Sequence, residues 1–165
     1  MCIRDRCRGV TQPIYIEALN QARADRPPDM TAALHICRGN FKGKWLTEGG
    51  YDEIAEAVFQ SVDVEGFFLE FDTQRAGGLE VLRHVPAGKR VVLGLVSSKI
   101  PQLEDLSVIR RRVEEATRYR PLESLSISPQ CGFASTVAGN PITEEDQIEK
   151  LNALVQLAGE IWESD

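Results

Sequence analysis

Two side chains that bind metal ions well, His35 and Cys37, are spaced two residues apart in a short apolar run. In a strand, alternate side chains point to the same face, so this spacing places the imidazole and the thiol together. A second thiol, Cys131, follows another apolar run, and Glu70 lies in a third, where an unpartnered carboxylate would be costly to bury. One imidazole, two thiols and a carboxylate suit Zn²⁺, so His35, Cys37, Glu70 and Cys131 form a candidate metal site.

The elements that must position these residues are strands that alternate with helices. Apolar runs typical of buried parallel strands lie at 32–37, 66–71, 90–96 and 125–128. Helices are expected at 13–25, 51–62, 76–84, 104–119 and from Thr143 to about Trp162. This order predicts an α/β fold with a parallel sheet, in which sites form where strands end. A lone His or Cys in a strand is more often core than ligand, so the site depends on the sheet bringing three strand ends together.

The number of predicted β/α units leaves two architectures open. Four β/α units fit either a small open sheet or half of a (β/α)8 barrel, which usually needs about 250 residues. For the last helix, the spacing predicts a buried stripe of Ile148, Leu151, Val155 and Leu157 to Ala158.

Composition excludes several classes of protein. The 165 residues allow one domain, and 19 basic against 25 acidic residues give a net charge of −6, which disfavours binding to nucleic acids or anionic membranes. No apolar run is long enough to span a bilayer. Four cysteines are too few for a disulfide scaffold, so we expect a reduced, cytoplasmic protein.

The first eight residues are set apart from the fold. Met1 to Arg6 resembles translated adapter sequence, so we expect residues 1–8 to be either a non-native or a disordered tail. Residues 9–165 then form the domain. Without Cys2 and Cys7, the remaining cysteines are the two candidate ligands.

The segments LHICRGNFKGKW, FFLEFDTQRAG, VVLGLVSSKIP and LSISPQCGFAS resemble the C-terminal catalytic barrel of cobalamin-independent methionine synthases, and most closely its shorter, single-barrel members. The resemblance covers nearly all of residues 10–163. It implies that the domain is the C-terminal half, about four β/α units, of a (β/α)8 TIM-type barrel. It also implies that His35 and Cys37 of the HxC strand, Glu70 of the next strand and Cys131 of the PxCG turn hold zinc.

The resemblance implies a zinc-dependent S-methyltransferase. In this family zinc activates the thiol of homocysteine, which takes a methyl group from 5-methyltetrahydrofolate, in its polyglutamate form, to give methionine. Glu70 would be the ligand that yields when the substrate sulfur enters. No catalytic residue beyond the zinc ligands is assigned.

Two departures from the family pattern matter. Full-length members carry a His a few residues before the Pro that matches Pro101, but this sequence reads LVSSKIP there. The other histidine, His84, precedes the third strand and is expected at the surface. Four of eight strands are counted, so we expect a truncated chain that is inactive alone. Two alternatives stay open: alkyl transfer involving another thiol or a non-folate donor, and a non-catalytic zinc-binding module.

Overall fold

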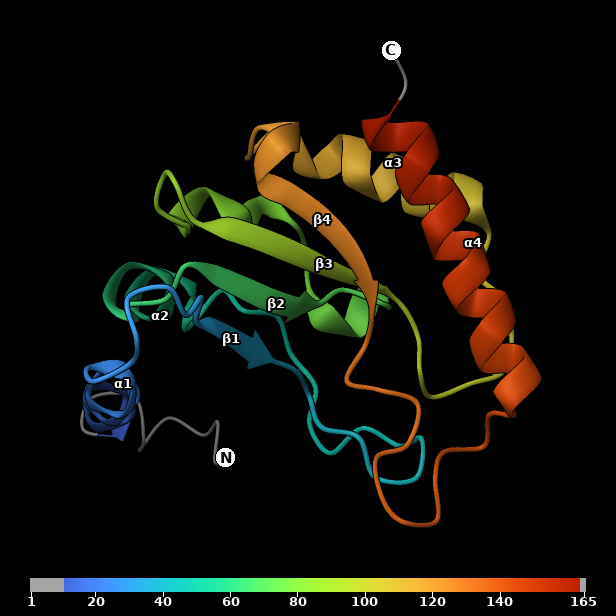
Figure 1. Cartoon of the computed structure of the whole chain (residues 1–165), viewed down its shortest axis with the longest axis horizontal. Helices are drawn as coiled ribbons and strands as arrows, with labels where there is room; N and C mark the ends of the chain where they lie inside the picture. The colour runs from blue at the N-terminus through green and yellow to red at the C-terminus, as the bar shows by residue number, and fades with distance from the viewer. Residues whose placement is uncertain (1–10, 164–165) are drawn as a thin grey trace.

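The computed structural model describes residues 11–163, and the segment 1–8 with Cys2 and Cys7 lies outside this range. Strands and helices alternate along the chain as expected (Figure 1). The elements are α1 (Thr11–Arg23), β1 (Ala33–Ile36), α2 (Ala55–Ser61), β2 (Gly66–Glu70), β3 (Arg90–Val96), α3 (Leu106–Ala116), β4 (Leu125–Pro129) and α4 (Glu144–Trp162), with short 3₁₀ helices η2 (Gln74–Ala76), η3 (Glu80–His84) and η4 (Leu122–Ser124).

The four strands form one parallel sheet in the order β1-β2-β3-β4. Each strand is added beside the previous one, and the order never reverses as it does in a doubly wound sheet. Consecutive addition of parallel strands is the arrangement from which a (β/α)8 barrel is built. The carboxyl ends of the strands therefore lie at one edge of the sheet, and the loops that follow β1 and β4 run side by side there (Figure 1).

The helix expected at 76–84 is replaced by the two 3₁₀ helices η2 and η3. Gly77, between them, has a φ of 82°, and a Cβ on it would lie 2.7 Å from the Cα of Gly50. The positive φ and this close backbone approach end the first turn, because a residue with a Cβ is strained in that conformation. The connection between β2 and β3 therefore has no full α-helix.

Aromatic side chains fill the centre of the core. Phe59 of α2 packs against Phe67 of β2 with ring centroids 4.9 Å apart, and Tyr51 contacts Phe71 edge-on at 5.3 Å. All four are at most 2% exposed. Their large apolar area fixes α2 against β2.

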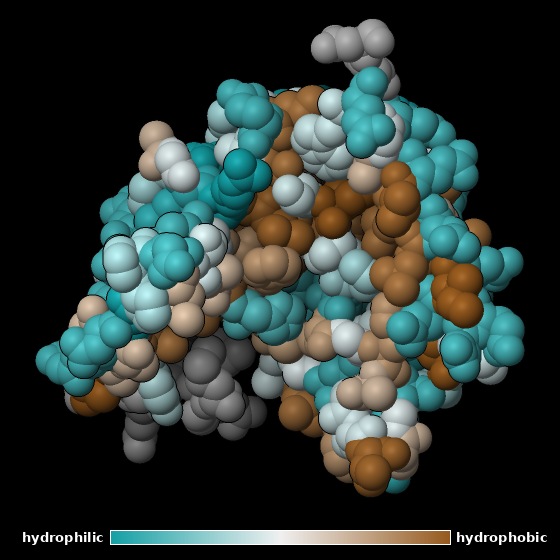
Figure 2. Space-filling model, viewed as in Figure 1, coloured by the Kyte–Doolittle hydropathy of each residue, from teal (hydrophilic) through white to brown (hydrophobic). Residues whose placement is uncertain are grey.

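Helix α4 begins at a capping box, in which Thr143 accepts the N–H of Asp146 and the Asp146 carboxylate accepts the N–H of Thr143. The predicted buried stripe on this helix is correct at Leu157 but wrong at its first three positions. Ile148, Leu151 and Val155 are 52%, 37% and 73% exposed, and apolar surface lies along α4 in Figure 2.

The buried side of α4 carries Lys150 and Leu154, which were not predicted, together with Leu157. The Lys150 ammonium is hydrogen-bonded to the Gln102 carbonyl and to Glu104, which lie between β3 and α3. The burial of Lys150 with these partners turns the helix away from the orientation that apolar spacing predicts. Among residues 11–163, no helix combines the length and the apolar character needed to cross a membrane.

Candidate metal centre

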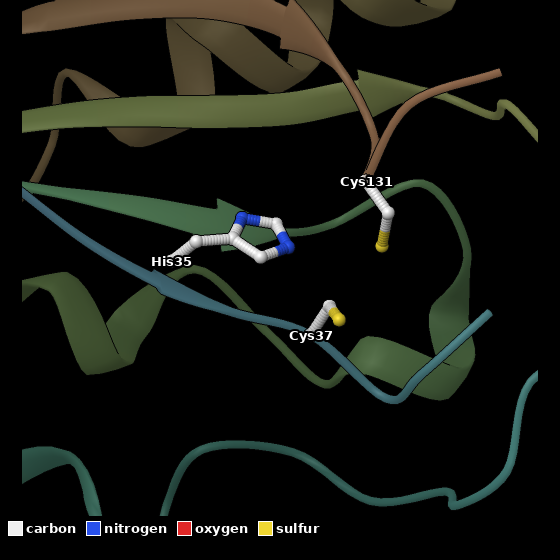
Figure 3. Close-up of side chains that lie close together, drawn as sticks. All are labelled: His35, Cys37 and Cys131. Carbon is white, nitrogen blue, oxygen red and sulfur yellow. The ribbon is translucent and has the colours of Figure 1, made fainter. Parts of the chain in front are cut away.

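Three of the predicted site residues come together at the carboxyl edge of the sheet. His35 lies on β1, Cys37 directly follows it, and Cys131 lies two residues beyond the end of β4. A ligand atom from each lies within 4.8 Å of those of the other two. Figure 3 shows the imidazole and both thiols converging from the two edge strands of the sheet. His35 and Cys131 are exposed and Cys37 is half-buried, so the cluster is open to small molecules.

The three groups also shift one another's pKa values. Hydrogen bonds with Cys131 and then with His35 lower the pKa of Cys37. The hydrogen bond with Cys37 raises the pKa of His35, and the same cysteine raises the pKa of Cys131. These shifts favour the thiolate form of Cys37, beside the imidazole of His35 and the thiol of Cys131. A thiolate, a thiol and an imidazole so close together fit the donors that zinc prefers.

The fourth predicted ligand, Glu70, is not part of this cluster. Its side chain is fully buried at the end of β2, where Oε2 accepts the N–H of Arg38 at 2.5 Å and Oε1 lies 2.9 Å from Arg75 and 3.4 Å from Lys99. Burial raises the pKa of Glu70, but the Arg38 N–H and the charge of Lys99 outweigh it and leave this pKa below its ordinary value. A buried carboxylate was expected to need a charged partner, and in this structure Glu70 has two, Arg75 and Lys99.

Lys99 and Arg75 were not predicted from the sequence as residues of the site. Each also faces Asp72, at 3.5 Å in both cases. The available signal was the alternation of Glu70 and Asp72 on one face of an otherwise apolar strand, because two buried carboxylates require cations nearby. His84 lies at the end of η3 and is partly exposed, before β3 and so away from the carboxyl edge of the sheet.

The position of Cys131 is set by the residue before it. The backbone N–H of Gln130 donates to Val96 at 2.8 Å, and its side-chain amide donates to the Gly94 carbonyl. A Cβ on Gly94 would lie only 2.8 Å from Nε2 of Gln130. Glycine in the middle of β3 therefore leaves room for the Gln130 side chain to cross the strand and fix the start of the Cys131 loop.

Asn140 joins the loops around the site, and it was not among the residues predicted from the sequence. Its Oδ1 accepts the N–H of Gly43 at 3.1 Å and the hydroxyl of Ser135 at 2.6 Å, and its Nδ2 donates to Ser98 at 2.7 Å and to Gly132 at 3.4 Å. One amide thus links the loops after β1, β3 and β4. The sequence does indicate a turn here, because Asn140 lies between Gly139 and Pro141. A turn pattern does not indicate which other loops the Asn side chain contacts.

A buried brace supports the Cys37 side of the site. The Arg38 guanidinium donates to the Gly49 and Ala76 carbonyls and lies 3.8 Å from the centroid of the Tyr51 ring. The Tyr51 hydroxyl accepts the N–H of Glu70 at 2.7 Å and donates to a β1 carbonyl at 2.9 Å. The ends of β1 and β2 are therefore fixed to one another by fully satisfied polar groups.

An open cleft of about 330 Å³ lies beside the cluster. Its floor includes Phe68, which is 40% exposed although it lies in the centre of the sheet. It is lined by His35, Phe68, Leu69, Gly94, Ser128, Pro129, Gln130, Cys131 and Gly132. The cleft can hold a small molecule with a sulfur or oxygen atom close to His35 and Cys131.

Comparisons with known proteins agree on one family. The family model for the catalytic domain of cobalamin-independent synthases matches residues 17–160. The uncharacterized protein YxjG of Bacillus subtilis is 49% identical over 150 residues, which cover 90% of this chain and 40% of the relative. The methionine synthase of Pyrococcus abyssi is 29% identical over 121 residues, or 73% of this chain and 32% of the relative.

A solved structure gives the same result. The crystal structure of the putative vitamin-B12 independent methionine synthase from Listeria monocytogenes superposes with a TM-score of 0.72 at 35% identity, covering 93% of this chain and 42% of that one. The chain spans about two fifths of the length of two curated relatives that it matches, YxjG and YxjH of Bacillus subtilis. Its four β/α units are a partial barrel of the TIM type, which confirms the predicted fold class. The chain belongs to the cobalamin-independent methionine synthase family, as part of the catalytic domain.

Proposed function

We propose that residues 9–165 are the zinc-binding part of a methyltransferase that acts on homocysteine. The observation that carries the proposal is the convergence of His35, Cys37 and Cys131 within 4.8 Å, in a chain of this family. Imidazole and thiolate donors are those of zinc sites in proteins, so the three residues would hold Zn²⁺. When bound, the metal lowers the pKa of a substrate thiol and so supplies a nucleophile at neutral pH.

The residues of the chain provide the surroundings of this chemistry. The cleft beside His35 and Cys131 has room for a small thiol, and Phe68 offers it an apolar floor. Asn140 fixes the Cys131 loop against the neighbouring loops, which holds the two thiols in register. In the proposed reaction homocysteine takes the methyl group of 5-methyltetrahydrofolate and leaves as methionine.

Metal analysis of the purified chain tests the proposal. We expect about one zinc per chain, and Cys131→Ser should lower the affinity at least a hundredfold because it removes one of the three clustered donors. Cys7→Ser is the matched control, since it also removes one thiol and should leave zinc binding unchanged. Full zinc retention by Cys131→Ser, or equal losses in both variants, would contradict the site.

A second candidate is alkyl transfer to another thiol or from a non-folate donor. It is favoured by the loop after β3, where the family's His is replaced and Lys99 points to Glu70 and Asp72. Cobalt-loaded protein titrated with homocysteine, cysteine or 2-mercaptoethanol separates these possibilities for the thiol, because thiolate binding to cobalt adds a strong absorption band. Saturation by homocysteine at concentrations at least tenfold lower supports the first candidate, and equal response to all three supports the second.

A further inference from the structure

The carboxylate of Glu70 is held beside the metal cluster by groups that would compete with a metal ion. Its Oε2 accepts the N–H of Arg38, the residue directly after Cys37, at 2.5 Å. Oε1 faces two cations, the Arg75 guanidinium at 2.9 Å and the Lys99 ammonium at 3.4 Å. The carboxylate is thus bound through Oε2 to the backbone of the residue after Cys37, while Oε1 faces the two cations.

Lys99 is the more specialised of the two cations. It is 3% exposed, and the hydrogen bonds that its ammonium makes within residues 11–163 go to Glu70 and Asp72. The Arg75 guanidinium has a further contact, because it stacks over the ring of Trp45 at 4.1 Å. A buried ammonium is costly to desolvate, and only carboxylates offset that cost here. Lys99 therefore helps to hold the Glu70 carboxylate, together with the Arg38 N–H and Arg75.

We propose that Lys99 is a positioning residue that competes with a bound metal ion for the Glu70 carboxylate. The inference rests on the proposed zinc site of His35, Cys37 and Cys131. While Lys99 holds Glu70, His35, Cys37 and Cys131 are the protein groups that would be available to a metal ion, and a catalytic zinc site typically has three protein ligands and one position for substrate. If Glu70 were released from Lys99, its carboxylate would be available as a fourth ligand in place of substrate. The charge of Lys99 thereby sets how readily a substrate thiol finds an open position.

The test is the affinity of the full chain for Zn²⁺, measured by competition with a chelator. Lys99→Met removes the competing charge at similar side-chain length, and we expect at least tenfold tighter zinc binding. Lys99→Arg restores the charge and should bind within threefold of the original chain. Lys89→Met is the matched control, because the Lys89 ammonium donates to the Val62 carbonyl near the start of β3. It should leave zinc affinity unchanged.

A second arm separates this effect from a general gain of negative charge. In a Glu70→Gln background, Lys99→Met should change zinc affinity less than twofold, because the ligand for which Lys99 competes is gone. The visible spectrum of the Co²⁺-loaded Lys99→Met variant should show one additional oxygen ligand, and Glu70→Gln should abolish that change. Circular dichroism establishes that each variant is folded. If Lys99→Met does not fold, Arg75→Met acts on the same oxygen and should raise zinc affinity at least threefold.

The outcomes distinguish the inference from the proposed function. If the original chain binds zinc and the folded variant binds no more tightly, the role of Lys99 is refuted and the metal site stands. An equal tenfold rise in the Glu70→Gln background also refutes it. If the original chain binds no zinc, the proposed site fails, and the inference fails with it.

Discussion

The Asn140 side chain offers a direct test of how the site loops are held. Asn140→Ala removes three hydrogen bonds of ordinary length, to Gly43 at 3.1 Å, to the Ser135 hydroxyl at 2.6 Å and to Ser98 at 2.7 Å. Each is worth about 1 kcal/mol net, and water can reach some of the partners that are left, so the unfolding free energy should fall by about 2–3 kcal/mol.

Urea unfolding followed by tryptophan fluorescence measures this change. At a slope of about 2 kcal/mol per molar urea, the midpoint should fall by roughly 1–1.5 M with the slope unchanged. Asn152→Ala is the matched control, because Asn152 is exposed on α4 and alanine favours a helix, so its stability should stay the same or rise slightly. Zinc affinity should fall only in Asn140→Ala, because Asn140 also contacts Gly132, next to the ligand Cys131. A loss below 0.5 kcal/mol would refute the view that one amide holds the three loops.

Three further variants test the support of the site. Tyr51→Phe removes a buried hydroxyl that joins β1 and β2, and calorimetry should show a loss of about 1–3 kcal/mol, against no loss if the hydroxyl is dispensable. Phe59→Ala empties a fully buried site, and chemical unfolding should register a loss of about 3–5 kcal/mol; a loss under 1 kcal/mol would mean that the core is loosely packed. For Glu65, the Ala32 N–H and the charge of Arg26 lower its pKa below the ordinary 4.5. Its stabilisation is therefore complete above pH 4.5 and is lost as the pH falls through the lowered pKa, so Glu65→Gln should be less stable than the original chain at pH 7 and approach it in acid; a constant difference across pH would contradict this.

The type and order of the elements could be predicted because they depend on local patterns. The runs that contain His35, Glu70 and the residues before Cys131 are short and apolar, and each became a strand at nearly the expected bounds. Where a tertiary contact overrides the local pattern, prediction fails. Helix α4 turns its Lys150 side inward because the Glu104 carboxylate and the Gln102 carbonyl accept hydrogen bonds from the ammonium there, and apolar spacing cannot reveal such partners.

The sequence by itself determined which donors could bind a metal ion and that strand ends would present them. The spacing of His35 and Cys37 settles which face they share, since a strand has a period of two. Only the tertiary structure decided that Cys131 joins them and that Glu70 is held by Lys99. Both depend on where β4 and the loop after β3 lie relative to β1. Such contacts join residues 29 to 96 positions apart, and they are set by the packing of the whole sheet.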